Sequence, residues 1–284
     1  MVKEEYKEYH SPHSGLFLTK DRVLFRERSR FQEIEIFENG FFGRVLTLDG
    51  LVMTTERDEF IYHEMLVHPA MVSHPHPKKV LIVGGGDGGT AREVLKYPVK
   101  EVHMVEIDEM VIEASRKYLP TISSSLDDER LTIHVQDATV WIKDRREIFD
   151  VVIIDSTDPI GPAEGLIGEE FFEDVFESLK EDGIMVIQSE SPHYHLDTIR
   201  TIAERLKKVF SHTYMYTAPI PTYPGGFWAF SLATKGLLPQ FRNRYPGKLK
   251  YFNRGIFEAA FRLPQFLLDR VGDLLDTPFQ SPSR

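Results

Sequence analysis

Two carboxylates three residues apart, Asp155 and Asp158, follow the apolar run 151–154. The run predicts a buried strand, and in open α/β sheets ligands bind beyond the carboxyl ends of the parallel strands. Acidic side chains at that edge favour a cationic substrate, and burial beside another carboxylate would raise the pKa of Asp155 so that it can take up a proton. The alternative is a turn stiffened by proline, because Asp, Ser, Thr and Pro all favour turns for local reasons.

A glycine-rich loop lies upstream of these carboxylates. Residues 79–83 predict a strand, residues 84–89 (GGGDGG) a loop and residues 90–95 a helix. Glycine lets the backbone turn tightly and approach a ligand closely, and the start of the helix offers free N–H groups. The spacing that begins with Gly84 and Gly86 fits G-x-G-x-x-G, which is a weak signal by itself.

The next predicted strand, residues 102–105, ends at Glu106, whose carboxylate can accept hydrogen bonds from ribose hydroxyls. A nucleoside-containing ligand is therefore expected. Asp87, inside the glycine loop, narrows the choice, because its charge would repel a pyrophosphate or the carboxylate of ordinary S-adenosylmethionine. Decarboxylated S-adenosylmethionine keeps the sulfonium and the amino group but lacks that carboxylate. A second interpretation of Asp87 is that it caps the following helix.

The first part of the chain predicts an antiparallel β domain. Hairpin signals at residues 39–40 (Asn-Gly) and 49–50 (Asp-Gly) accompany short predicted strands. Residues 58–72 predict a connecting helix, and the His-Pro-His-Pro run 74–77 breaks it. We therefore expect residues 1–75 to form an N-terminal β-rich domain plus its connecting helix.

From residue 80 to about residue 209, apolar strands alternate with amphipathic helices, which indicates right-handed crossovers and a mainly parallel sheet. The elements expected after the glycine loop are strands 131–135, 151–154 and 184–188, helices 169–180 and 196–209, and a terminal hairpin of 213–217 and 227–232. Residues 76–284 are thus expected to form a Rossmann-like catalytic domain of the class I methyltransferase type. The expected fold class is α/β with a small N-terminal antiparallel β domain.

Several separated motifs resemble, in the right order, those of the polyamine aminopropyltransferases, the spermidine synthases. The likeness runs from about Arg28 to Phe266. The segments that carry it are LDG (48–50), ERDEF (56–60), YHE (62–64), GGGDGG (84–89), DSTDP (155–159) and PTYP (221–224). The resemblance implies an enzyme that moves an aminopropyl group from decarboxylated S-adenosylmethionine to a primary amine and releases 5′-methylthioadenosine. It implies no prosthetic group, since the donor is a co-substrate.

The resemblance also assigns roles to single residues. Asp155 matches the catalytic base, and Asp87 matches the residue that holds the aminopropyl ammonium. The other expected cofactor contacts are Gly84 and Gly86 in the loop, Gln32 and His63 at the nucleoside or its thioether, Glu106 at the ribose, and Asp137 and Ala138 at the adenine. The acceptor amine is expected among Tyr62, Asp87, Asp155, Asp158 and Tyr223. The simpler interpretations are that both tyrosines are core aromatics and that Gln32 faces solvent.

The chain departs from the family pattern at a few positions. The tryptophan that many relatives carry near the amino terminus is absent, and Tyr6 or Tyr9 is the candidate replacement. Met53 stands where relatives often have glutamine, and Phe257 stands where histidine is common. Neither of the last two changes touches the expected chemistry.

The composition fits a soluble enzyme that acts on small cations. With 44 acidic and 34 basic residues the formal charge is −10, which argues against a general nucleic-acid surface and favours cationic partners such as polyamines. The absence of cysteine excludes a thiol nucleophile and thiolate metal sites, and the histidine spacing predicts no metal. No run has the length of a membrane span or the form of a signal sequence, so we expect a cytoplasmic location. The resemblance implies a homodimer or homotetramer.

Other functions stay open at this stage. A methyltransferase that uses ordinary S-adenosylmethionine would share the fold, but Asp87 and the two carboxylates at 155 and 158 fit it poorly. A nicotinamide oxidoreductase and a non-catalytic polyamine or nucleoside sensor are further alternatives. Among acceptors, putrescine is expected from its frequency in the family, with agmatine and cadaverine as the alternatives.

Overall fold

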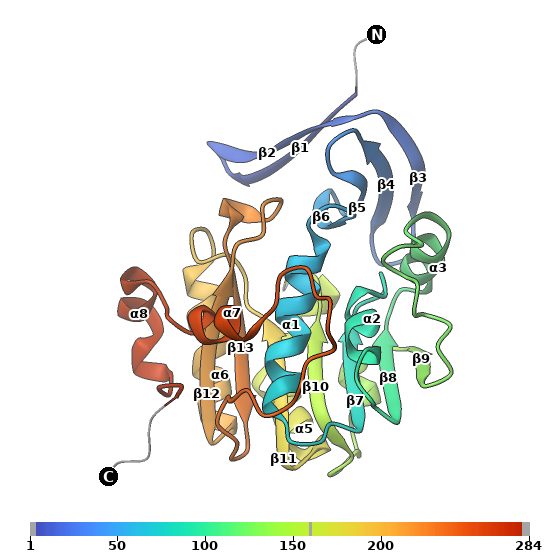
Figure 1. The fold of residues 1–284 in the computed structure, drawn as a ribbon. Helices are drawn as coiled ribbons and strands as arrows, with labels where there is room; N and C mark the ends of the chain where they lie inside the picture. Colours follow the sequence, from blue (N-terminus) through green and yellow to red (C-terminus); the bar gives the residue numbers. More distant parts are fainter. Residues whose placement is uncertain (1–3, 159–160, 280–284) are drawn as a thin grey trace.

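The computed structural model describes residues 4–158 and 161–279, and Figure 1 shows an antiparallel β region above an α/β domain. The β region consists of a two-stranded sheet, β1-β2, and a four-stranded sheet, β3-β4-β5-β6. The strands are β1 (Glu4–Ser11), β2 (Ser14–Lys20), β3 (Arg22–Arg28), β4 (Glu33–Asn39), β5 (Gly43–Leu48) and β6 (Leu51–Thr55). Asp49 and Gly50, with φ of 46° and 81°, form the turn between β5 and β6, as the hairpin signal predicted.

Seven strands form the sheet of the α/β domain, in the order β12-β13-β11-β10-β7-β8-β9. The strands from β11 to β9 in that order run parallel, and β13 pairs antiparallel with β11 and β12. Their bounds are β7 (Lys79–Gly84), β8 (Glu101–Glu106), β9 (Leu131–Val135), β10 (Phe149–Asp155), β11 (Leu179–Gln188), β12 (His212–Ala218) and β13 (Trp228–Thr234). This mainly parallel sheet confirms the predicted fold class and the terminal hairpin.

Helices cover both faces of this sheet (Figure 1). They are α1 (Glu59–Ser73), α2 (Gly89–Leu95), α3 (Glu109–Tyr118), α4 (Ala138–Trp141), α5 (Glu169–Ser178), α6 (Leu196–Val209), α7 (Arg254–Ala260) and α8 (Gln265–Val271), with 3₁₀ segments η1 (Gly161–Ile167), η2 (Pro224–Gly226) and η3 (Gly272–Leu274). Val80 and Ile82 of β7 belong to the core of α1 and α2, whereas Leu81 and Val83 belong to that of α5 and α6. Because both faces are covered, the middle of each central strand is a continuous apolar run, 80–83 in β7 and 151–154 in β10.

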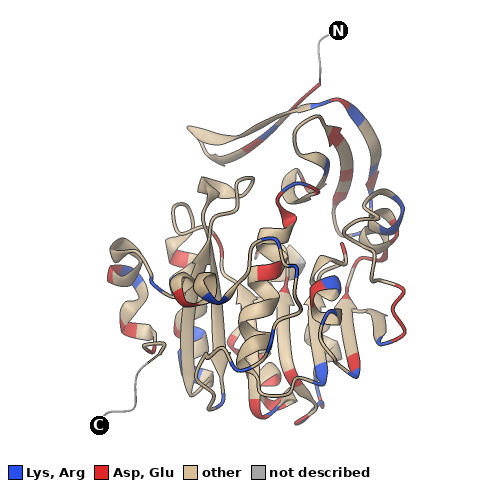
Figure 2. Ribbon diagram, in the orientation of Figure 1, with Lys and Arg blue, Asp and Glu red and all other residues tan. Residues whose placement is uncertain are grey.

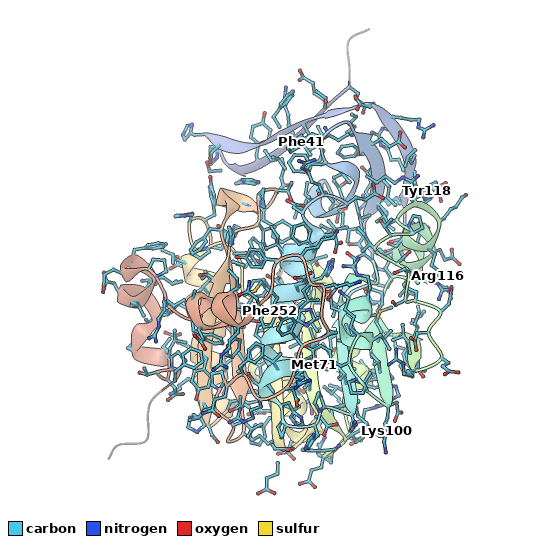
Figure 3. All side chains as sticks on the ribbon, viewed as in Figure 1. Phe41, Met71, Lys100, Arg116, Tyr118 and Phe252 are labelled. Carbon is cyan, nitrogen blue, oxygen red and sulfur yellow. The ribbon has the colours of Figure 1, made fainter. Side chains whose placement is uncertain are left out.

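Helix α1 continues through Pro69, which breaks most helices. Pro69 lacks the N–H that would bond the carbonyl of Met65, and the Tyr216 hydroxyl donates to that carbonyl instead, at 2.8 Å. The C-terminal segment holds α1 from outside, because Glu64 accepts three successive backbone N–H groups that end at Phe252, each at 2.8 Å. Figure 3 shows Phe252 beside this helix. Helix α1 is thereby fixed against the sheet.

One predicted helix is shorter than expected. The pattern predicted a helix over residues 169–180, but α5 ends at Ser178 and β11 begins at Leu179. Leu179 is fully buried and pairs with Phe149 of β10. Pairing and burial in the sheet therefore override the helical periodicity of the last two residues, and that part of the prediction was wrong.

Helix α3 connects the two regions of the fold, since its Val111 and Ala114 pack with Ile34 and Leu46 of the four-stranded sheet. Basic and acidic residues are interspersed over both regions (Figure 2). Among residues 4–158 and 161–279, no helix is both long and apolar enough to cross a membrane. Residue 159 of the DSTDP motif lies outside the described residues.

Candidate active site

A cavity of about 220 Å³ lies between the carboxyl ends of β7, β8 and β10 and the four-stranded N-terminal sheet. Every residue that the sequence analysis assigned to a site lines it. These residues are Gln32, Tyr62, His63, Gly84, Gly86, Asp87, Glu106, Asp137, Ala138, Asp155, Asp158 and Tyr223. The fold thus gathers around one cavity side chains that come from both regions of the chain.

Asp155 is the last residue of β10, and both oxygens of its carboxylate accept a hydrogen bond. The hydroxyl of Tyr62 donates to Oδ1 at 2.6 Å, and the hydroxyl of Thr90 donates to Oδ2 at 2.7 Å. Burial raises the pKa of Asp155, and Asp87 adds to this rise, whereas His63 and the two hydroxyls oppose it. The net result is a pKa of Asp155 above its usual range, which strengthens the affinity of the carboxylate for a proton. The two hydroxyls also fix its orientation.

The glycines of the loop allow two close approaches. Gly84 has a φ of 80°, and a Cβ there would lie 2.2 Å from the backbone oxygen of Asp155. A Cβ on Gly89 would lie 2.2 Å from Cε1 of His63. Any larger residue would push the loop away from β10 or from α1, so glycine is what lets the loop reach both.

His63 lies between two carboxylates. Its Nδ1 is 2.7 Å from Oε2 of Glu59, one turn earlier on α1, and its Nε2 is 3.4 Å from Oδ2 of Asp87. Burial lowers the pKa of His63, but the two carboxylates outweigh burial and raise it well above its ordinary value. Asp87 also accepts the N–H of Gly89 at 2.8 Å through Oδ1. Asp87 therefore both caps the loop and presents a second oxygen to the cavity.

At the far side of the cavity, Glu106 accepts the N–H of Gly86 at 3.2 Å and the N–H of Asp108 at 2.9 Å. Burial raises the pKa of Glu106 to about 7, although these backbone donors oppose the rise. The amide of Gln32 donates to Oδ2 of Asp108 at 3.0 Å. Gln32 is half-buried and lines the cavity, so the interpretation that it faces solvent was wrong.

Asp137 caps the start of helix α4 and accepts the N–H of Thr139 at 2.9 Å through Oδ1. The next residue, Ala138, is buried at the first position of that helix. Both line the end of the cavity nearest β9. A short apolar residue beside a carboxylate can hold a planar base by its face and its edge.

A smaller cavity of about 30 Å³ continues from the first and shares Tyr62, Asp158 and Tyr223 with it. The Tyr223 hydroxyl donates to the backbone oxygen of Met53 at 2.6 Å, and its ring centroid is 5.4 Å from that of Tyr62. Burial raises the pKa of Asp158 to about 7, with Glu190 adding to the rise. This end of the site combines aromatic walls with an acidic group.

Two protein-family models match the chain. The spermidine synthase tetramerisation domain matches residues 6–56, and the spermine/spermidine synthase domain matches residues 59–243. The chain belongs to the spermidine synthase family. It is a polyamine aminopropyltransferase, which confirms the resemblance and the predicted class of reaction, and the methyltransferase, oxidoreductase and sensor alternatives are set aside.

Individual relatives agree with this assignment. The polyamine aminopropyltransferase of Alkaliphilus metalliredigens is 44% identical over 275 residues, which cover 94% of this chain and 97% of the relative. The crystal structure of spermidine synthase from Thermotoga maritima has a TM-score of 0.91 and 42% identity, and the match covers 95% of this chain and 94% of that one. A spermidine synthase structure in complex with the transition-state analogue AdoDATO has a TM-score of 0.92 and 42% identity, with 95% of each chain covered.

The aminopropyltransferase site also contains residues that the sequence analysis missed. Thr90 donates a hydrogen bond to Asp155, and Asp108 accepts one from the amide of Gln32. Glu59 is hydrogen-bonded to Nδ1 of His63. Glu59 had a local signal, the i, i+4 spacing on a helix. The smaller cavity is further lined by Glu8 and Gln188, which no local pattern connects with it.

A cluster of three side chains in this aminopropyltransferase can hold a small cation. Ligand atoms of His63, Asp87 and Asp155 all lie within 4.8 Å of one another. The family uses decarboxylated S-adenosylmethionine as co-substrate, and its amino group supplies such a cation. The absence of a metal from the reaction stays a prediction. Tyr6 is buried and Tyr9 is 73% exposed, and neither is among the residues that line the two cavities.

Proposed function

We propose that this aminopropyltransferase moves the aminopropyl group of decarboxylated S-adenosylmethionine to putrescine, forming spermidine and releasing 5′-methylthioadenosine. The observation that carries the proposal is the acidic cluster in the cavity, where Asp87 of the glycine loop lies 3.4 Å from His63 and close to Asp155. An ammonium group is attracted there. The carboxylate of an intact S-adenosylmethionine would meet like charge in a poorly hydrated site.

The donor is proposed to lie along the larger cavity, with its nucleoside toward β8 and β9. Glu106 would accept the ribose hydroxyls, because its carboxyl group already faces the loop. The remaining proposed contacts are Asp137 and Ala138 at the adenine, Gln32 and His63 at the nucleoside or thioether, and the backbone of Gly84 and Gly86. Asp87 would then hold the aminopropyl ammonium.

The acceptor amine must lose a proton before it can attack. An alkyl ammonium with a pKa near 10.4 costs about 4–5 kcal/mol to deprotonate at pH 7. Asp155 is the proposed base, because its pKa is raised and Tyr62 and Thr90 hold its two oxygens in place. Positive charge then passes from the sulfonium sulfur to the attacking nitrogen, and a fixed carboxylate beside that nitrogen stabilises the shift.

The smaller cavity suits a short diamine. It measures about 30 Å³, and Glu8 and Asp158 line it together with the rings of Tyr62, Tyr223 and Trp228. The rings can enclose an aliphatic chain, and the carboxyl groups can face a second ammonium. This supports putrescine over the longer cadaverine and over agmatine, whose guanidinium is broader.

The acceptor is tested by incubating the enzyme with decarboxylated S-adenosylmethionine and equal concentrations of putrescine, cadaverine, agmatine and spermidine, with products identified by mass. We expect the aminopropylated product of putrescine to form fastest, in equal amount to 5′-methylthioadenosine. A reaction with ordinary S-adenosylmethionine is the matched control and should give no product. If agmatine or cadaverine reacted faster than putrescine, that amine would be the preferred acceptor and the proposal for putrescine would be wrong.

We also infer that the chain forms a homodimer or homotetramer. The support is the match to a tetramerisation domain over residues 6–56 and the exposure of Tyr9, Phe17 and Phe41 in that region. Light scattering after size-exclusion chromatography measures the mass directly, and the mass of a single 32.8 kDa chain would contradict the inference. The cytoplasmic location stays a prediction.

A further inference from the structure

Helices α1 and α2 lie side by side on one face of the sheet, and a row of buried charged side chains crosses the contact between them (Figure 1). Arg92 of α2 donates to Oε2 of Glu59 at 2.7 Å and to Oε1 of Glu93 at 3.0 Å. Glu59 and Glu93 are 6% and 1% exposed. The row ends beside the cavity, where Glu59 meets His63. Buried charges are costly to desolvate, so a row of them that ends at a ligand site calls for a functional reason.

The two ring nitrogens of His63 have different contacts. Nδ1 makes a 2.7 Å hydrogen bond with Glu59, whereas Nε2 lies 3.4 Å from Oδ2 of Asp87. Burial raises the pKa of Glu59, but His63 and Arg92 outweigh burial and lower it to about 2. An ionised carboxylate can only accept, so Nδ1 is the donor and carries a proton. If the ring loses a proton, it is therefore the one on Nε2, on the side of the cavity.

In the free enzyme the imidazolium of His63 is itself a cation among carboxylates. Ligand atoms of Asp87 and Asp155 lie within 4.8 Å of one on His63, and Glu59 bonds Nδ1. The ring of Tyr62 packs edge-on with its centroid 5.3 Å away. Burial lowers the pKa of His63, but Asp87 and Glu59 raise it well above its ordinary value. The ring thus carries both protons before a ligand enters.

The donor's ammonium must enter the same space, and this step of the argument rests on the proposed function. A second cation at Asp87 would lie beside the imidazolium of His63, 3.4 Å from the carboxylate, and like charges repel strongly where water is excluded. Without its Nε2 proton the ring is neutral, and Nε2 becomes an acceptor. An ammonium has three N–H groups, so it can donate to Asp87 and to Nε2 together.

We propose that Glu59 is a positioning residue, which holds the Nδ1 proton of His63 while the donor's ammonium takes the place of the Nε2 proton. No covalent bond to carbon forms or breaks in this step. The imidazolium becomes the neutral Nδ1–H ring, its Nε2 electron pair accepts an N–H of the ammonium, and the released proton goes to the buffer. One positive charge replaces another, so the net charge of the cluster is unchanged. 5′-Methylthioadenosine has no ammonium and should leave the proton in place.

Calorimetric titration at neutral pH in phosphate and in Tris counts the released protons, because the two buffers take up a proton with different enthalpies. Decarboxylated S-adenosylmethionine is titrated without an amine, and 5′-methylthioadenosine gives the contribution of the nucleoside contacts. In wild type we expect the donor to release about one proton more than 5′-methylthioadenosine. Its affinity should then rise by about tenfold per pH unit, since proton release and binding are linked.

Glu59→Gln is compared with the matched control Glu93→Gln. Glutamine at position 59 keeps the size and an oxygen for the Nδ1 proton but removes the charge, so the extra proton release should fall below about half a proton. Glu93 bonds the same arginine and has no contact with His63 among those described for it, so its variant should still release about one. Unchanged release in Glu59→Gln would place the proton on another group, such as Asp155, and overturn the proposal. Equal falls in both variants would show a structural role of the row and overturn it too.

Nitrogen NMR of protein with ring-labelled histidine gives the state of His63 directly, and it needs no Glu59 variant to fold. The signals of His63 are assigned by their absence from His63→Gln. In wild type they should change from those of an imidazolium to those of the neutral Nδ1–H ring when the donor binds. An imidazolium that persisted with the donor bound would overturn the exchange alone. A wild-type protein that neither bound the donor nor transferred an aminopropyl group would overturn the proposed function first.

Discussion

The hydroxyl of Tyr62 donates a 2.6 Å hydrogen bond to Oδ1 of Asp155, and this bond joins helix α1 to the carboxyl end of β10. Burial, and after it the charge of Asp155, raise the pKa of Tyr62 well above its ordinary value, so the hydroxyl keeps its proton and acts as a donor. The proposed base is thus oriented by a side chain 93 residues away in sequence.

Replacing Tyr62 by phenylalanine should lower kcat by roughly ten- to a hundredfold, from the about 1.5–3 kcal/mol that a hydrogen bond to a charged group contributes. The hydroxyl lowers the pKa of Asp155, so its removal raises that pKa further. Because the base must be ionised, the acid limb of the pH–rate profile should lie at a higher pH in the variant than in wild type. Tyr223→Phe is the control, since its hydroxyl binds the backbone of Met53. An equal shift in both profiles would contradict the specific role of Tyr62.

Asp155→Asn should lower kcat by roughly 10²–10⁴-fold, the range for loss of a general base, while the affinity for 5′-methylthioadenosine changes little. Asparagine keeps the size of the side chain and an oxygen that can accept from Tyr62 or Thr90. Raising the pH should rescue the variant in part, because more of the free amine arrives neutral. A variant with near-normal kcat at neutral pH would exclude Asp155 as the base.

Asp87→Asn should weaken binding of decarboxylated S-adenosylmethionine by roughly ten- to a hundredfold, as expected for a lost hydrogen bond between charged groups. Binding of 5′-methylthioadenosine, which has no ammonium, should change far less. The remaining side-chain oxygen can still accept the Gly89 N–H, so the loop should keep its shape. Titration calorimetry with both ligands measures the difference. Equal losses would mean that Asp87 shapes the loop and does not bind the ammonium.

Ionised Glu59 should stabilise the fold, so the free energy of unfolding should fall as the pH becomes acidic. Burial raises its pKa, but His63 and Arg92 outweigh burial and lower the pKa from 4.5 to about 2. A carboxyl group with a lowered folded-state pKa stabilises the fold above its unfolded pKa, and this contribution is lost as the pH falls toward the folded value. The shift corresponds to about 3 kcal/mol, of which about 2 kcal/mol is lost between pH 7 and pH 3.

Urea unfolding of wild type and Glu59→Gln at both pH values tests this. The free energy of unfolding should fall by about 2 kcal/mol less in the variant. Glu258→Gln is the control, because Glu258 is exposed on α7 and pairs only with Arg254 among the contacts described for it. The idea would have to be given up if Glu59→Gln and wild type lost the same free energy.

Sequence alone determined the fold class, the cavity edge and the candidate residues on it. The apolar strands and the glycine loop are local patterns, and parallel strands end at a common edge, so Asp87, Glu106 and Asp155 could be placed together from their positions in the chain. The family motifs added Tyr62 and Tyr223, which lie far from that edge in sequence. All of them do line one cavity.

Only the tertiary structure decided which groups hold these residues. Thr90 meets Asp155 because the glycine loop turns the start of α2 toward β10, and Glu8 reaches the smaller cavity because β1 folds over it. The end of α5 at Ser178 depends on the pairing of Leu179 with Phe149 of β10. Such contacts join residues distant in the chain, and their energies depend on burial and mutual distance, which no local pattern contains.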